Sequence, residues 1–290
     1  MKTQSAKVDT YGLTDVGKVR SHNEDQFLIA SLHKRMALHF TSLSDVSELE
    51  RLTSPDAFLF LVADGVGGVM GGEVASSTAV QSVARYIAHT TDCYYTFNVD
   101  QEHQFMDQLQ SSVIECHTAL QEEFGTGGRR SKPGPATTLT LVTVMWPRAY
   151  IIQVGDSRCY YLRNGKLKQL TQDQTLGREM VDMGVMSETD VQNAGLDNVL
   201  SSAIGATIRP ALGLIDLEPD DVLLLCTDGL TKHVSDEEIC RALDTLENAE
   251  QMCRHLVDAA LEGGGSDNVT VVVSRVVGNG DTAPAPAPTP

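Results

Sequence analysis

The apolar residues of this chain form short continuous runs as well as longer stretches with helical spacing. Residues 58–63 form one run and are followed by Asp64-Gly65, and residues 222–226 form a second that leads into Asp228-Gly229. Runs of this length, bounded by turn residues, predict strands that are buried on both faces. A strand that stops at Asp-Gly places a carboxylate at its end. The two runs therefore predict two aspartates side by side at the ends of buried strands.

The remaining pattern predicts paired helices and further short strands. Apolar residues at helical spacing predict four helices, over 72–88, 105–124, 236–243 and 249–261. β-Branched and apolar segments broken by turn residues predict strands at 27–30, 137–145, 149–154, 159–163, 211–217 and 269–274. The three segments between 137 and 163 predict an antiparallel meander. Strands outnumber helices and the helices come in pairs, which favours an α+β sandwich over alternating βαβ units.

Two segments do not follow this pattern. Residues 175–198 are polar and Met-rich, and we expect them to form a small surface flap inserted in the domain. The Ala-Pro repeats near the end of the chain predict that residues 278–290 are a disordered tail. The sequence therefore predicts one domain, residues 8–277, that includes the flap.

Net charge and cysteine content limit the classes of partner and the cellular compartment that we expect. The formal net charge of −17 gives no source of affinity for nucleic acid or an anionic membrane. The segment Met1–Asp9 is polar, and nowhere is there an apolar stretch of membrane-spanning length. Six cysteines without a C-x-x-C motif are typical of a reducing compartment. We therefore expect a cytoplasmic protein with neither a nucleic-acid nor a membrane partner.

Two glycine-rich segments resemble nucleotide-binding loops but lack required residues. Gly12 to Val19 approaches a phosphate-binding loop, yet Lys18 is not followed by the Ser or Thr that would ligate Mg²⁺. Gly65 to Gly71 approaches a dinucleotide fingerprint, but Met70 stands where the third glycine is required. Neither segment predicts a nucleotide site.

Acidic residues recur beside turns and strand ends all along the chain. They are Glu24-Asp25, Asp64, Asp156, Asp228 and Asp267. Taken singly, an Asp-Gly pair is a common turn with no further role. Carboxylates gathered in one pocket repel one another unless a cation or proton lies between them, and oxygen ligands suit Mg²⁺ or Mn²⁺. Arg20, close to the first pair, offers a bidentate cation that matches the oxygens of a phosphoryl group.

In chain order these residues lie in a series of short motifs that together resemble those of one protein family. The motifs are Arg-x-x-Asn-Glu-Asp, Val-Ala-Asp-Gly-Val-Gly-Gly, Ala-Thr-Thr, Gly-Asp-Ser-Arg, Cys-Thr-Asp-Gly-Leu and Ser-Asp-Asn-Val-Thr. Over about residues 8–277 the chain resembles the metal-dependent serine/threonine protein phosphatases of type 2C, bacterial branch. The resemblance implies a four-layer α-β-β-α sandwich, in which two antiparallel sheets are flanked by helix pairs and the metals lie at one end.

The resemblance also implies roles for the acidic residues, with two Mn²⁺ or Mg²⁺ ions. Asp64 would bridge the ions, the Gly65 carbonyl would bind one, and Asp228 and Asp267 would bind the other. Glu24 and Asp25 would hold metal-bound waters. Two interpretations of Asp156 stay open, a hydrogen bond to a strand turn and a third metal site shared with Asp228.

The implied activity is hydrolysis of phosphoserine and phosphothreonine in proteins. A metal-bridged hydroxide would attack phosphorus directly, without a phospho-enzyme, and a Ser/Thr kinase and its substrates would be the partners. Two alternatives are a phospho-binding pseudophosphatase scaffold and a small-molecule phosphoesterase. The chain departs from the family pattern at Val66, where some members carry His, at Ala136 for Gly, and at Ser202 for Arg.

Overall fold

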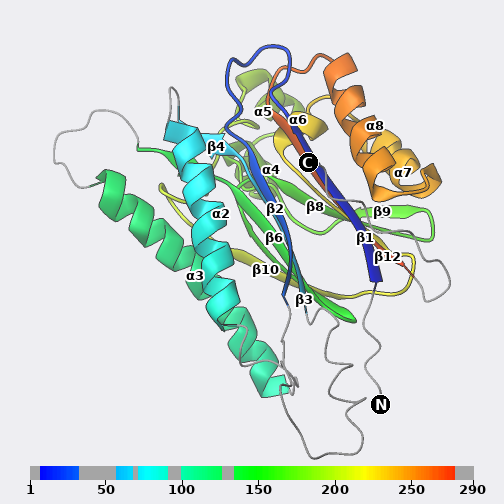
Figure 1. Ribbon diagram of the computed structural model, residues 1–290. Helices are drawn as coiled ribbons and strands as arrows, with labels where there is room; N and C mark the ends of the chain where they lie inside the picture. Colours follow the sequence, from blue (N-terminus) through cyan, green and yellow to red (C-terminus); the bar gives the residue numbers. More distant parts are fainter. Residues whose placement is uncertain (1–6, 33–56, 68–70, 91–98, 126–133, 278–290) are drawn as a thin grey trace, which may run out of the picture.

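Two antiparallel sheets stacked face to face form the centre of the molecule in a computed structural model (Figure 1). The structure describes residues 7–32, 57–67, 71–90, 99–125 and 134–277. The first sheet contains, in spatial order, β1 (Lys7–Asp15), β12 (Val269–Val277), β11 (Val222–Cys226), β8 (Arg158–Arg163) and β9 (Lys166–Gln169). The second contains β10 (Ala211–Asp216), β7 (Arg148–Val154), β6 (Leu139–Met145), β3 (Ala57–Ala63) and β2 (Gln26–Leu32). The predicted tail, residues 278–290, lies outside the described residues.

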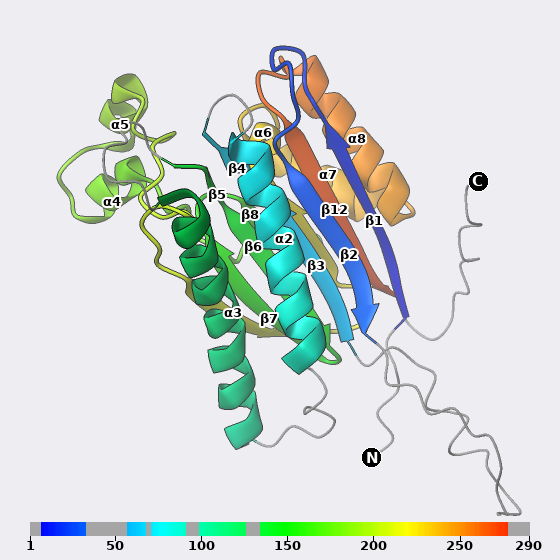
Figure 2. The ribbon, with the colours of Figure 1, turned by 60° about the vertical axis from the view of Figure 1, so that its left-hand side comes forward.

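Helix pairs cover the outer faces of both sheets (Figure 2). Helices α2 (Gly71–Thr90) and α3 (Val99–Gly125) cover the second sheet, and α7 (Asp236–Thr245) and α8 (Ala249–Glu262) cover the first. Side-chain caps start the second pair, because Ser235 and Asn248 accept from backbone N–H groups of the first turns. The expected four-layer α-β-β-α architecture is confirmed.

The continuous apolar runs are explained by this layering. On β3, Phe60 and Val62 lie in the cluster between the two sheets, whereas Leu59 and Leu61 lie in the cluster beneath α2 and α3. Strand β11 is likewise buried at every position. Since both faces of each strand are covered, no polar residue interrupts the run.

Strand β1 is a feature that the sequence pattern did not predict. It pairs with β12 along its whole length, from Lys7 opposite Val277 to Asp15 opposite Val269. Within it, a Cβ on Gly12 would lie 2.5 Å from the ring of Phe27. Gly12 therefore serves close strand packing, and the near-match to a phosphate-binding loop belongs to a strand and the turn after it.

The predicted meander over residues 137–163 is wrong at its third strand. β6 and β7 pair as expected, but β8 belongs to the opposite sheet, where it pairs with β11 and β9. The change of sheet occurs at Gly155, whose φ of +101° is open to glycine but strained for other residues. A Cβ there would lie 2.6 Å from Thr138. A local sequence pattern does not distinguish this turn from a hairpin.

The segment expected to be a flap contains two short helices, α4 (Leu176–Asp182) and α5 (Glu188–Ala194), beside the sandwich (Figure 2). Thr175 and Ser187 cap their N-termini. The turn between them exposes Met183 and Val185. The helices of this segment are therefore marked by their capping residues, because they are too short to show a clear apolar periodicity.

The described residues contain no helix that combines the length and apolar character needed to span a membrane. The five cysteines that the structure describes are all free thiols: Cys116, Cys159, Cys226, Cys240 and Cys253.

Candidate metal centre

Strand register brings the predicted acidic residues together from both sheets. In the second sheet Gln26 pairs with Ala63, which places Asp25 opposite Asp64 just beyond the strand ends. In the first sheet Cys226 pairs with Val271, so that the segments leading to Asp228 and Asp267 leave the same end. The two Asp-Gly runs therefore lie on different sheets, not on neighbouring strands, and their carboxylates meet across the sandwich.

Asp25 connects the two sheets. Its Oδ2 accepts hydrogen bonds from Thr227 Oγ1 at 2.8 Å and from Thr270 Oγ1 at 2.7 Å, both in the first sheet's strand ends. Its Oδ1 is buried without a hydrogen-bond partner. Burial raises the pKa of Asp25 to about 7, against the opposing effect of the two threonine hydrogen bonds. The side chain is thus fixed in position, and its Oδ1 has no hydrogen-bond partner.

Asp64 is fixed through its backbone. Its N–H donates to Thr138 Oγ1 at 2.9 Å, and its carbonyl oxygen accepts from Thr137 Oγ1 at 2.8 Å and from the Thr138 N–H at 2.9 Å. Burial, and then repulsion from Asp25 and Asp228, hold the pKa of the Asp64 carboxyl well above its usual range. The threonine pair is structural and aims this carboxylate into the acidic pocket.

Asp156 lies in the turn that carries the chain from β7 to β8. The turn is held by neighbouring residues, because the Gly155 N–H donates to Gln174 Oε1 at 2.8 Å and the Ser157 hydroxyl pairs with Thr138 Oγ1 at 2.7 Å. Burial, and then repulsion from Asp228, raise the pKa of Asp156 to about 7. Through the Ser157 hydroxyl and Thr138, which accepts from the Asp64 N–H, this turn is held beside the strand end that carries Asp64.

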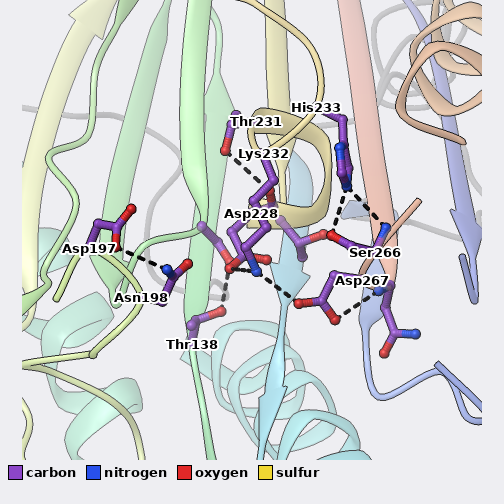
Figure 3. A network of polar contacts seen from close by, with 12 residues as sticks. Thr138, Asp197, Asn198, Asp228, Thr231, Lys232, His233, Ser266 and Asp267 are labelled. Carbon is purple, nitrogen blue, oxygen red and sulfur yellow. Dashed lines mark hydrogen bonds and ion pairs between the residues drawn. The ribbon is translucent and has the colours of Figure 1, made fainter. Parts of the chain in front are cut away.

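Two basic side chains neutralise the other half of the cluster, and Figure 3 shows one of them, Lys232. Lys232 Nζ lies 2.6 Å from Asp228 Oδ2 and 2.8 Å from Asp267 Oδ2. Arg20 Nε lies 2.8 Å from Asp267 Oδ1. Burial would raise the pKa of Asp267, but the hydrogen bonds from Lys232 and Arg20 outweigh it and hold that pKa below its usual range. Asp228 keeps a buried Oδ1 without a hydrogen-bond partner.

Sequence reasoning missed Lys232. The signal was a basic residue four positions after Asp228, where a helical turn places both side chains on one face. That turn is α6 (Asp228–Thr231), a single short helix directly after β11. Arg20, by contrast, was predicted to bind phosphate and does reach the cluster, where it is about half exposed and paired with Asp267.

Close backbone packing explains the glycine after Asp64. A Cβ on Gly65 would lie 2.3 Å from the Gly72 carbonyl oxygen and 2.7 Å from the Glu24 carbonyl oxygen. Gly65 begins the short strand β4 (Gly65–Val66), which pairs with β5 (Ala136–Thr137). Its N–H donates to the Glu24 carbonyl at 3.2 Å, so the Glu24 backbone is held beside the cluster.

Asn268 is a second residue whose role the motif did not reveal. Its Oδ1 accepts from the Glu24 N–H at 2.9 Å, and its Nδ2 donates to the carbonyl oxygens of Val16 and His22, each at 2.9 Å. A Cβ on Gly229 would lie 1.9 Å from the Asn268 carbonyl oxygen. One amide therefore ties the loop that carries Arg20 and Glu24 to the start of β12.

The donor set fits a hard divalent cation, although not in its present arrangement. Within the described ranges, no three carboxylate, imidazole or thiol side chains already stand as a ligand set. The pocket nevertheless holds orphaned buried oxygens on Asp25 and Asp228, and burial, with repulsion from neighbouring carboxylates, raises the pKa of Asp64 and of Asp156. A divalent ion would relieve both. The ammonium of Lys232 must then leave the two oxygens that it contacts.

Comparison with known proteins gives relatives that are similar in sequence. The chain is 36% identical over 222 residues to the serine/threonine protein phosphatase PstP of Mycobacterium tuberculosis, which covers 76% of this chain and 41% of PstP. It therefore spans about two fifths of the length of that relative. It is 28% identical over 262 residues to the serine/threonine phosphatase stp of Listeria monocytogenes, which covers 90% of this chain and 92% of stp.

Solved structures agree in fold. A crystal structure of M. tuberculosis PstP has a TM-score of 0.72 at 28% identity and covers 93% of this chain and 99% of that chain. A catalytic domain of PstP, crystallised in complex with two manganese ions, has a TM-score of 0.71 at 29% identity and covers 95% of this chain and 100% of that chain. A family model described as protein phosphatase 2C matches residues 49–263, which is most of the chain. The chain belongs to the protein phosphatase 2C family.

Proposed function

We propose that this protein hydrolyses phosphoserine and phosphothreonine in other proteins, with two divalent metal ions held at the end of the sandwich. The observation that carries the proposal is the meeting of aspartates from both sheets in one pocket, with buried oxygens of Asp25 and Asp228 left unpartnered. Family membership supports it, as does PstP, whose catalytic domain was crystallised with two manganese ions.

The residue roles follow the position of each carboxylate. Asp64, central in the cluster by its repulsion with the other aspartates, would bridge the two ions, with the Gly65 carbonyl beside it. Asp228 and Asp267 would bind the second ion. Glu24 and Asp25 would hold metal-bound waters, since Asp25 uses one oxygen for threonine hydroxyls.

A third ion at Asp156, shared with Asp228, is the interpretation we favour for that residue. Its supports are the repulsion between the two carboxylates and a turn that neighbouring residues already hold.

When bound, two divalent ions would lower the pKa of water towards neutrality and so supply the nucleophile for direct attack on phosphorus. The residues of the chain orient the substrate. Arg20 has the planar fork that matches two phosphoryl oxygens, and it is exposed enough to reach solvent from its present pairing with Asp267. The net charge of −17 repels a phosphorylated substrate, so phosphate affinity depends on these local cations.

The partners that we propose are phosphoproteins and the Ser/Thr kinase that phosphorylates them. The free thiols of the described cysteines suit a reducing cytoplasmic setting. A phospho-binding scaffold without turnover would be expected to lack carboxylates from the cluster, whereas every predicted ligand position is acidic in this chain apart from the Gly65 carbonyl.

The test is hydrolysis of a phosphothreonine peptide and of p-nitrophenyl phosphate by the purified protein, with Mn²⁺ and with a chelator. We expect Mn²⁺-dependent release of phosphate, with a higher kcat/KM for the peptide. Activity that persists after complete chelation would contradict the metal mechanism. Turnover of p-nitrophenyl phosphate without turnover of phosphopeptides would favour the small-molecule phosphoesterase, and binding of phosphopeptide without turnover would favour the scaffold.

A further inference from the structure

Lys232 occupies the centre of the half of the cluster formed by Asp228 and Asp267 (Figure 3). Its Nζ lies within hydrogen-bond distance of one oxygen from each, at 2.6 Å and 2.8 Å. These two carboxylates come from different elements, α6 and the turn before β12, and both are about four-fifths buried. A single ammonium therefore holds two separate segments together.

The backbone fixes the base of this side chain. The Lys232 N–H donates to the Asp228 carbonyl oxygen at 2.9 Å at the end of α6, and the side chain is 29% exposed. The ammonium is held at this position by its two ion pairs with Asp228 and Asp267.

The surrounding charges determine what Lys232 does. Arg20 contacts Asp267 from the exposed side, and Asp156 lies close enough to Lys232 for the ammonium to oppose the rise in its pKa. Asp228 and Asp267 are also the two residues to which the proposed function gives the second metal ion. An ammonium and a divalent ion cannot share the same carboxylate oxygens, because like charges at contact distance repel strongly.

We propose that Lys232 is an internal counter-ion that holds Asp228 and Asp267 in the metal-free protein and competes with the second metal ion for them. The inference rests on the proposed function, since it concerns the same metal site. The exchange breaks no covalent bond: the ammonium leaves two oxygens and the divalent ion takes them. The flexible stem of lysine lets the charge move towards Asp156 or solvent.

Two consequences follow from this competition. Lys232 weakens metal binding, because each binding event must first break its two ion pairs. It also protects the metal-free fold, because it neutralises carboxylates that would otherwise repel across the sandwich. A residue that only packed against the site would not weaken metal binding in this way.

The test is calorimetric titration of Mn²⁺ into the chelator-treated protein, comparing wild type with Lys232→Met, Lys232→Arg and Lys166→Met. Lys166, exposed on β9 at the far end of β8, is the control for loss of one positive charge. We expect Lys232→Met to bind the weaker of its Mn²⁺ ions about tenfold more tightly than wild type, given two partly buried ion pairs. Lys232→Arg and Lys166→Met should stay within about twofold of wild type.

Thermal unfolding gives an independent readout. In chelator, Lys232→Met should melt at a lower temperature than wild type, and excess Mn²⁺ should reverse the order. An Mn²⁺ affinity of Lys232→Met that equals or falls below that of wild type would overturn the inference. If that variant cannot be purified without metal, equal affinities of Lys232→Arg and Lys232→Gln would overturn it in the same way.

Failure of the proposed function looks different. If neither wild type nor Lys232→Met binds Mn²⁺, both the metal site and this inference are wrong. If both bind Mn²⁺ with the same affinity and wild type hydrolyses phosphopeptide, only the role of Lys232 is wrong. If Lys232→Met alone binds Mn²⁺ measurably, the competition is confirmed in its strongest form.

Discussion

The two sheets deliver their carboxylates to the same pocket in opposite electrostatic states. On the first sheet, Asp228 and Asp267 are paired with Lys232, and Arg20 reinforces Asp267. On the second sheet, burial raises the pKa of Asp25 and of Asp64, whose hydrogen bonds here are to neutral threonine hydroxyls and backbone groups. A divalent ion that entered this pocket would therefore displace an ammonium on one side and protons on the other.

The largest expected effect is the loss of turnover when one proposed metal ligand is removed, from either side of the pocket. Asp64→Asn and Asp228→Asn should each reduce Mn²⁺-dependent kcat about a thousandfold, equivalent to about 4 kcal/mol of activation free energy. The measurement is steady-state hydrolysis of a phosphothreonine peptide. Asp258→Asn, on the exposed face of α8, is the matched control and should retain wild-type kcat. Normal turnover by either ligand variant would show that the site is wrongly assigned.

Arg20 should matter for substrate affinity more than for turnover. Arg20→Ala should raise KM for the phosphopeptide about tenfold, because one bidentate phosphate contact is lost. Arg20→Lys should recover only part of this loss, since an ammonium does not present two parallel donors. The checks are KM and the inhibition constant for inorganic phosphate. A variant that changes kcat alone would contradict a phosphate-binding role.

In chelator, substitutions on the two sides of the pocket should shift the melting temperature in opposite directions. Asp228→Asn should lower the melting temperature, because Lys232 loses a partner in a partly buried pair, a cost of about 1 to 2 kcal/mol. Asp64→Asn should raise it, since Asp64, with its raised pKa, must take up a proton on folding near neutral pH, whereas asparagine is neutral in both states. The measurement is thermal unfolding followed by circular dichroism. Shifts of the same sign would remove the contrast between the sheets.

The smallest effect is on the pH dependence of the metal-free fold. Carboxyl groups ionise near pH 3.8 when unfolded, whereas the pKa of Asp25 and of Asp156 is raised to about 7 in the folded protein. Between these values the folded state binds more protons, so its stability from these groups falls as pH rises from about 4 to 7. Asp267, whose pKa is lowered, contributes a constant amount above its unfolded value.

Melting temperatures in chelator should therefore decrease from pH 5 to pH 7. Asp25→Asn should flatten this slope, because it removes one of the titrating groups, which also include Asp156 and Asp64. A melting temperature that rises steadily over the same interval, in wild type and variant alike, would contradict the assigned pKa directions.

The sequence predicted the acidic residues of the cluster better than the contacts that bring them together. Asp64 and Asp228 could be placed because each ends a run buried on both faces, and that pattern is local. Strand β1 could not, because its polar and apolar residues alternate weakly and its existence depends on pairing with β12, more than 250 residues away. The change of sheet at Gly155 was missed for a similar reason, since a strained turn and a hairpin turn share the same residues.

Lys232 shows a further limit of sequence reasoning. A basic residue four positions after an aspartate indicates a surface helix pair, and nothing local indicates that Asp267 completes the contact. Thr227 and Thr270 are similar. Thr227 lies between β11 and α6 and Thr270 lies in β12, and only the stacking of the sheets brings their hydroxyls to Asp25. Roles that depend on two distant segments were therefore not predicted.

The hydrogen bonds to Asp25 also bear on how the protein is made. Its two threonine partners lie 202 and 245 residues later in the chain. During synthesis, which proceeds from the N-terminus, the first half of the cluster is therefore present long before the strands that complete it. A nascent chain cannot assemble the complete cluster until β12 has left the ribosome. A protein truncated before Thr270 lacks this hydrogen bond to Asp25 and therefore the complete cluster.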